Sequence, residues 1–246
     1  KLGVEMEIEH AGKYKDAGDI FTRTSMSPET REAMTSILDD LYARVLAGVA
    51  AGRGKTADEL RALMDEGPFL APVAKSKGLV DELNYENVAR KALADKAKVK
   101  ESALVKDRAY LAAGYAPKTK GKRRRVAVLV AQGDIVRTGS TSMFGEEMLL
   151  EPGKMSSLAR EIGSDRTIDA VVVRIDSPGG DAVASDEILA AMKELSKKKP
   201  LVVSMSDLAA SGGYYMAMTG DPVVAEAGTL TGSIGVIYGK PNMKGL

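Results

Sequence analysis

The 246-residue sequence contains no cysteine, which excludes disulfides, thiolate metal ligands and cysteine catalysis. It has one histidine, His10, so a histidine-assisted serine triad is unpromising, and acid–base chemistry near neutral pH needs a retuned lysine or carboxylate. Its 35 basic and 34 acidic residues nearly cancel, which gives no reason to expect nucleic acid as a partner. We expect neither a cofactor nor a bound metal.

Long apolar runs are also missing: no stretch approaches the roughly 18 continuous apolar residues of a membrane-spanning helix. No charged leader precedes an apolar core, so no signal peptide is visible. The sequence opens at Lys1-Leu2-Gly3 and stops at Lys244-Gly245-Leu246, both inside what reads as structured sequence. We therefore expect a piece of a longer protein, whose membrane attachment would lie in parts absent from this chain.

The first half of the sequence is predicted to be mainly helical. Ser27-Pro28-Glu29 places a capping serine before a proline at the first helical position. Thr56-Ala57-Asp58-Glu59 has the pattern of a capping box, and Gly67-Pro68 ends the helix that it starts. A third helix is expected at residues 85–98.

The second half is predicted to be α/β. It follows a basic stretch at residues 117–125, which lacks interleaved aromatic residues and is interpreted as a solvated linker. Beyond the linker lie apolar runs at residues 126–130, 170–175 and 201–205, and a helix is expected to start near Ser185. Strand, helix and strand in this order predict a largely parallel sheet, and continuous β-branched runs are typical of strands buried on both faces.

Three glycine-rich turns follow these strands and are the candidate site. They are Asp176-Ser177-Pro178-Gly179-Gly180-Asp181, Ala209-Ala210-Ser211-Gly212-Gly213 and Leu230-Thr231-Gly232-Ser233-Ile234-Gly235. The second places a serine at an expected helix start, where its hydroxyl stays exposed and the next N–H points at a developing oxyanion. Open α/β sheets keep their sites at the carboxyl ends of their strands, where all three turns are expected.

Together the three turns resemble the core of the signal peptide peptidase A (protease IV) family of serine peptidases. The resemblance rests on Arg174-Ile175-Asp176-Ser177-Pro178-Gly179-Gly180, Ala209-Ala210-Ser211-Gly212-Gly213-Tyr214-Tyr215 and Leu230-Thr231-Gly232-Ser233-Ile234-Gly235-Val236. It implies a ClpP/crotonase-like fold of repeated β-β-α units. It also implies Ser211 as nucleophile, Ser233 as a support for the catalytic lysine, and an oxyanion hole from Gly179 or Gly180 together with Gly212.

The base implied by the resemblance is a lysine near the start of the chain. Gly12-Lys13-Tyr14-Lys15-Asp16-Ala17, followed by Met26-Ser27-Pro28-Glu29, is similar to the family's lysine-bearing segment. Residue reasoning leaves Lys13 and Lys15 equally possible, because a two-residue step along an extended chain places both on one face. The resemblance selects Lys15.

The order of lysine before serine resembles the long, two-repeat form of the family. It implies that residues 1–120 are the C-terminal part of a first repeat and residues 121–246 the N-terminal part of a second.

The implied activity is a Ser–Lys endopeptidase that degrades cleaved signal peptides and other short apolar peptides. The implied location is the bacterial cell envelope, at the inner membrane, with the catalytic part on the extracytoplasmic side. The resemblance further implies a ring-shaped homo-oligomer, a tetramer, with Met143-Phe144 near an interface or the substrate channel. Two alternatives remain: a crotonase-like enzyme acting on acyl-CoA, which would not need Ser211, and a non-catalytic ring-assembly module.

Overall fold

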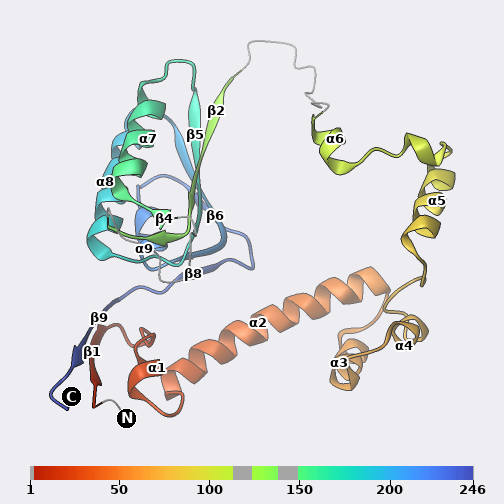
Figure 1. The fold of residues 1–246 in the computed structure, drawn as a ribbon, viewed down its shortest axis with the longest axis horizontal. Helices are drawn as coiled ribbons and strands as arrows, with labels where there is room; N and C mark the ends of the chain where they lie inside the picture. The colour runs from red at the N-terminus through yellow and green to blue at the C-terminus, as the bar shows by residue number, and fades with distance from the viewer. Residues whose placement is uncertain (1–2, 113–123, 138–148, 246) are drawn as a thin grey trace. The chain divides into compact units, whose positions relative to one another are not determined.

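The computed structural model describes residues 3–112, 124–137 and 149–245, and Figure 1 shows their fold. Met143-Phe144 and residues 117–123 of the expected linker lie outside the described residues. Two compact units are present. We call residues 1–36 and 122–246 the core unit, and residues 37–121 the helical unit.

The two units do not coincide with the halves of the sequence. The boundary predicted at residue 120 falls at one edge of the helical unit, but residues 1–36 group with the second half of the chain. The assignment of the two halves to two repeats stays a prediction.

The core unit is built on a parallel sheet with the strand order β2-β5-β6-β7, and β8 also pairs with β6. In register, Val128 lies beside Val172 and Val172 beside Val202. This sheet confirms the predicted α/β class. Its strands are β2 (Val126–Gln132), β5 (Ala170–Ser177), β6 (Leu201–Ala210), β7 (Val223–Val224) and β8 (Leu230–Gly232).

Two helices, α7 (Pro152–Ser164) and α8 (Ala182–Ser196), cover one face of this sheet (Figure 1). The helix expected to start near Ser185 starts three residues earlier, because the Asp181 carboxylate caps it by accepting a 2.9 Å hydrogen bond from the Ala184 N–H. Ser185 is buried in the first turn. The core fills the space between the sheet and these helices, and includes Leu129, Ala131, Val171, Val173, Ile175, Ile188, Met192, Leu195, Val203 and Met205.

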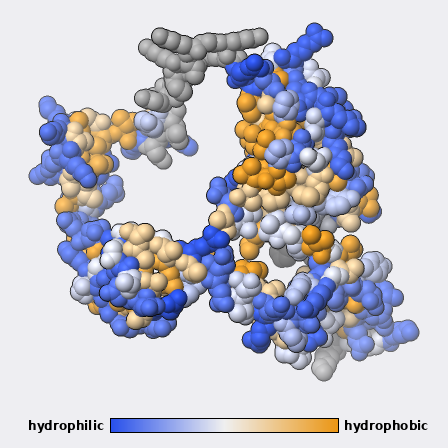
Figure 2. Space-filling view, turned by 180° about the vertical axis from the view of Figure 1, so that it is seen from behind, coloured by the Kyte–Doolittle hydropathy of each residue, from blue (hydrophilic) through white to orange (hydrophobic). Residues whose placement is uncertain are grey.

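The opposite face of the sheet is half-buried along β5 and exposed along β2, so the expectation of strands buried on both faces is wrong. Along β2, Leu129 and Ala131 are 4% and 0% exposed, whereas Val126, Val128 and Val130 are 55%, 62% and 54% exposed. Successive side chains of a strand point to opposite faces, and α7 and α8 both lie on the same one. Figure 2 shows hydrophobic surface on the core unit.

Short elements complete the core unit. The strands β1 (Glu5–Ala11) and β9 (Val236–Asn242) form an antiparallel ribbon that joins the two ends of the chain. The helix α1 (Asp19–Thr22) follows β1, and α9 (Gly212–Met216) follows β6 directly. The strands β3 (Asp134–Ile135) and β4 (Leu149–Leu150) pair with each other.

Helices make up the helical unit and confirm the helical prediction for the first half. The helix α2 (Pro28–Arg53) begins in the core unit, and its later turns belong to the helical unit. Thr56 and Glu59 form the predicted capping box of α3 (Ala57–Glu66). The remaining helices are α4 (Ala71–Ser76), α5 (Glu86–Ala97), the 3-10 helix η1 (Glu101–Ala103) and α6 (Asp107–Ala112).

The helices in the described ranges include none that is both long enough and apolar enough to cross a membrane.

Candidate active site

Ser211 stands at the junction of β6 and α9, in a backbone conformation that non-glycine residues rarely adopt. Its φ is 52° and its ψ is −117°. Such a conformation costs on the order of 1–3 kcal/mol and persists only where the surroundings enforce it. Here the Ser211 N–H donates to the Gly232 carbonyl at 2.8 Å, and the Ser211 carbonyl accepts from the Tyr215 N–H at 2.8 Å. The backbone is thus held on both sides of the serine.

Lys15 lies beside Ser211, although 196 residues separate them in sequence. Its Nζ lies 3.0 Å from Ser211 Oγ, 3.0 Å from Ser233 Oγ and 2.8 Å from the Ser233 carbonyl oxygen. Burial lowers the pKa of the Lys15 amine, since the charged form loses solvation there. Three neutral oxygens therefore surround an amine that is biased toward its neutral form.

Lys13 lies elsewhere, so the structure separates the two lysines that residue reasoning left open. Its exposed Nζ donates to the Tyr14 hydroxyl at 3.1 Å and lies 3.7 Å from Glu32. The hydrogen bond to Tyr14 raises the pKa of the Lys13 amine. The premise of one extended face is wrong, because β1 ends at Ala11 and a hydrogen bond from the Lys15 N–H to the Gly12 carbonyl closes a turn.

Ser233 stands in the turn between β8 and β9 and also has a positive φ, 50°. Behind it, Gly235 packs against the start of the chain. A Cβ on Gly235 would lie 2.3 Å from the Ala11 carbonyl oxygen and 3.2 Å from Lys15 Cβ, so a side chain there would displace the lysine. This close packing brings the Lys15 turn against the serine.

The Pro-Gly-Gly turn lies directly against the Ser211 turn. Gly179 has a φ of 97°, and a Cβ on it would lie 2.4 Å from the Gly212 nitrogen and 2.9 Å from Ser211 Cβ. Only glycine, which has no side chain and tolerates this φ, lets the two turns approach so closely.

The two glycines of this turn differ in what their N–H groups do. The buried Gly179 N–H donates to Ser177 Oγ at 3.1 Å, and Ser177 Oγ donates to the Gly133 carbonyl at 2.7 Å. Among the described residues, no group accepts from the Gly180 N–H, and Gly212 is the first residue of α9, where an N–H has no partner within the helix. Gly180 and Gly212 thus keep donors free for a ligand.

Ser177 is a site residue that the sequence analysis missed. It is fully buried and holds the Gly179 N–H. Its signal was the serine two residues before a glycine in Ser177-Pro178-Gly179, since a hydroxyl commonly accepts the N–H two residues further on.

His10 does not reach Ser211. Its exposed ring lies 3.2 Å from the Gly12 carbonyl oxygen. No cluster of three or more His, Asp or Glu side chains suited to a metal ion occurs within the described ranges.

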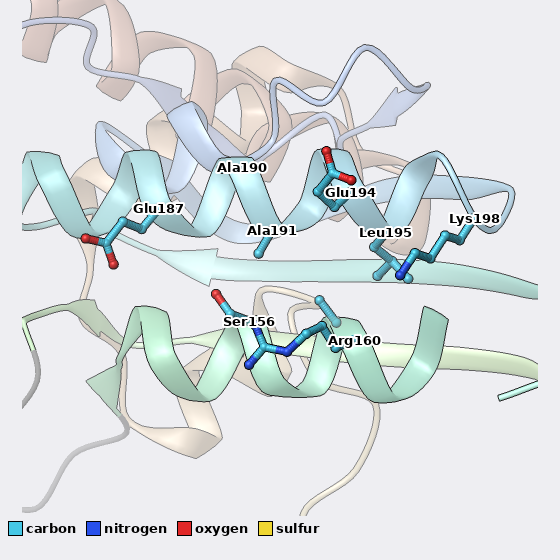
Figure 3. Close-up of a pocket in the computed structure, with 9 residues that line it drawn as sticks. Ser156, Arg160, Glu187, Ala190, Ala191, Glu194, Leu195 and Lys198 are labelled. Carbon is cyan, nitrogen blue, oxygen red and sulfur yellow. The ribbon is translucent and has the colours of Figure 1, made fainter. Parts of the chain in front are cut away.

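A groove of about 470 Å³ lies between α7 and α8, away from these turns (Figure 3). Small residues such as Ala159 and Ala191 form part of its lining, and Arg160, Glu187 and Lys198 add charges. None of the predicted site residues lines this groove.

Comparison with known proteins identifies the family of this chain. Residues 1–100 and 193–246 match the sequence model of peptidase family S49. The chain is 36% identical over 242 residues to the chloroplastic serine protease SPPA of Arabidopsis thaliana. It is 34% identical over 255 residues to Protease 4 of Salmonella typhi and 30% identical over 253 residues to Protease 4 of Haemophilus influenzae.

Each of these three alignments covers 96% of this chain but only 36%, 39% and 40% of the respective relative. The chain therefore spans well under half the length of these relatives. Among solved structures, a variant of the 1510-N membrane-bound stomatin-specific protease overlaps 45% of this chain and 47% of its own, at 19% identity and a TM-score of 0.34.

Proposed function

The chain belongs to peptidase family S49, and from this membership we propose that it carries the catalytic centre of a serine endopeptidase with a Ser–Lys dyad. Ser211 is the nucleophile and Lys15 the general base. The observation that carries the proposal is the 3.0 Å distance between Lys15 Nζ and Ser211 Oγ, in a chain without a histidine near the serine.

The proposed reaction begins with neutral Lys15. A neutral amine has two N–H groups and one lone pair, so it donates to the two Ser233 oxygens and accepts the Ser211 proton. As the proton moves to Nζ, Ser211 Oγ bonds to the scissile carbonyl carbon, and the carbonyl oxygen becomes an oxyanion. The Gly180 and Gly212 N–H groups, which have no hydrogen-bond partner among the described residues, stabilise that charge.

Collapse of the tetrahedral intermediate breaks the peptide bond and leaves an ester on Ser211. The Lys15 ammonium returns its proton to the departing amine and is neutral again. Water then attacks the ester by the same route, giving up a proton to Lys15, and the Ser211 hydroxyl re-forms when the acid product leaves. Atoms and protons balance without a cofactor.

The lysine must be neutral near pH 7 for this chemistry. An unperturbed lysine has a pKa of about 10.4, and lowering it by about three units requires roughly 4 kcal/mol of differential desolvation. Burial lowers the pKa of Lys15 in this direction. A substrate lying over the site would remove further solvent from the amine.

As substrates we propose cleaved signal peptides and other short apolar peptides, bound in extended form beside the glycine turns. We further propose that the whole protein acts at the inner membrane of a bacterial cell envelope, on the extracytoplasmic side, as a homo-oligomer that we expect to be a tetramer. The bacterial Protease 4 relatives support an envelope location.

The test is labelling of the full-length protein with a serine-directed acylating reagent, followed by peptide mapping. We expect the label on Ser211, and its loss in Ser211→Ala. The matched control is Ser157→Ala, which changes an exposed serine of α7 and should label as the parent does. Labelling of another serine with Ser211 unmodified would contradict the proposal.

A further inference from the structure

The residue after the proposed base, Asp16, has an unusual partner for a partly buried carboxylate. Its Oδ2 accepts a hydrogen bond from the hydroxyl of Thr30, near the start of α2. The Thr30 Oγ1 lies 2.7 Å from Ser27 Oγ, which in turn accepts from the Thr30 N–H at 3.0 Å. The Ser27 hydroxyl therefore donates to Thr30, and Thr30 donates to Asp16. We call Ser27, Thr30 and Asp16 the hydroxyl relay.

The relay anchors the turn that carries Lys15. Its donors point toward the Asp16 carboxylate, and hydrogen bonds in such a chain strengthen one another. The N-terminus of α2 adds a favourable field, since the helix dipole is positive there. One residue earlier, the Lys15 N–H bonds to the Gly12 carbonyl, and the Asp19 N–H bonds to the Asp16 carbonyl at 2.8 Å. The turn is thus fixed on both sides of Lys15.

The relay also fixes the position of the carboxylate that follows Lys15 in the sequence. Within about 4–6 Å a carboxylate favours the ammonium form of a lysine and raises its pKa. Asp16 is the adjacent residue, yet in the part of the chain that the structure describes Lys15 Nζ forms its hydrogen bonds with oxygens of Ser211 and Ser233.

Other charged groups near this turn have partners of their own. Glu32 lies 3.7 Å from Lys13, and Asp19 lies 3.6 Å from Arg23. The charge of Glu29, in the first turn of α2, helps to raise the pKa of Lys13. The His10 ring contacts the Gly12 carbonyl. Asp16 is therefore the neighbouring carboxylate whose placement depends on hydroxyl groups rather than on a cation.

We infer that Thr30, with Ser27 behind it, is a positioning residue that acts through Asp16: the relay holds the Asp16 carboxylate away from the Lys15 amine. The inference rests on the proposed Ser–Lys function. It predicts that loss of the Thr30 hydroxyl frees the Asp16 carboxylate to pair with Lys15. The pairing stabilises the ammonium form of Lys15, so less neutral amine is available as the base.

The test is the pH dependence of kcat/KM for peptide hydrolysis by the full-length protein. Thr30→Val keeps the shape of the side chain and removes the donor. We expect the acid limb of its kcat/KM profile to move up by about one pH unit, so that kcat/KM falls about tenfold at pH values below the limb. The high-pH plateau of kcat/KM should stay at the parent level. Thr30→Ser keeps a hydroxyl and should follow the parent, as should the control Thr24→Val, which changes an exposed threonine outside the relay.

The double variant Thr30→Val/Asp16→Asn separates charge from structure. It lacks the carboxylate, so its limb should return to the parent position. A uniform loss at every pH in Thr30→Val, or a limb that stays shifted in the double variant, would overturn the inference. Should Thr30→Val not fold, Ser27→Ala removes the earlier donor and should move the limb the same way by less.

Failure of the proposed function gives a different result. If Lys15→Ala keeps its activity, the dyad itself is wrong, whatever Thr30→Val does. If Lys15→Ala is inactive and the limb of Thr30→Val does not move, the dyad stands and only the role of Asp16 is lost.

Discussion

The assignment of the base to Lys15 rather than Lys13 yields the sharpest test of the proposed chemistry. Lys15→Ala removes the amine that lies 3.0 Å from Ser211 Oγ. General-base catalysis contributes about 10²–10⁴-fold, and at about 1.36 kcal/mol per tenfold the expected rise in barrier is roughly 3–5 kcal/mol. We therefore expect kcat/KM for peptide hydrolysis to fall by at least about a hundredfold.

Lys13→Ala is the matched control, two residues away. The Lys13 side chain is 60% exposed and its pairing with Glu32 spans 3.7 Å, and such surface pairs contribute about 0–1 kcal/mol. We expect its kcat/KM to stay within a few-fold of the parent. Lys15→Arg should be as inactive as Lys15→Ala, since a guanidinium stays charged near neutral pH and cannot accept the proton.

The assay follows hydrolysis of a short apolar fluorogenic peptide against pH in the full-length protein. Burial lowers the pKa of Lys15, so the neutral amine forms at lower pH than in a free lysine, and the parent rate should rise with pH through that lowered pKa. An inactive Lys13→Ala, or a Lys15→Arg that keeps its rate, would refute the placement of the base.

Two further predictions concern the groups around the dyad. Ser233→Ala should reduce kcat about tenfold without abolishing turnover, because the Ser233 carbonyl oxygen, 2.8 Å from Lys15 Nζ, still holds the amine. Complete inactivity would mean that the Ser233 hydroxyl itself takes part in proton transfer. Gly179→Ala should lower both the unfolding temperature and the activity, because its Cβ would lie 2.4 Å from the Gly212 nitrogen. The control Gly153→Ala should change neither, because no atom lies within 4 Å of its Cβ. Equal unfolding temperatures of the two variants in thermal denaturation would contradict the close approach of the two turns.

Local features of the fold were predictable because each depends on neighbouring residues. The capping box of α3 needs only Thr56 and Glu59, three residues apart, and it forms as predicted. The parallel strands and the helix start at Ser211 likewise follow from short runs of residues. The structure starts α8 at Ala182 rather than near Ser185, because Asp181 caps the helix although it also ends the Pro-Gly-Gly turn.

Burial could not be predicted from the same runs. The β-branched sequence of β2 is compatible with one or two covered faces, and only the packing of α7 and α8 on one side decides that Val128 is 62% exposed and Leu129 is 4% exposed. The amino-acid composition of a strand shows that its side chains can be buried. Whether each face of the strand is buried depends on where the other elements pack.

The sequence by itself determined the kinds of residue available for chemistry: serines in glycine turns, the lysine pair Lys13 and Lys15, and no cysteine. Only the tertiary structure decided which of them meet. Lys15 reaches Ser211 because the β1–β9 ribbon brings residues 5–11 against residues 236–242 and a turn at Gly12 directs Lys15 toward Ser233. Among the described residues, the Gly180 N–H has no partner, whereas the Gly179 N–H donates to the buried Ser177 hydroxyl. Both outcomes depend on contacts between distant segments, which spacing along the chain does not encode.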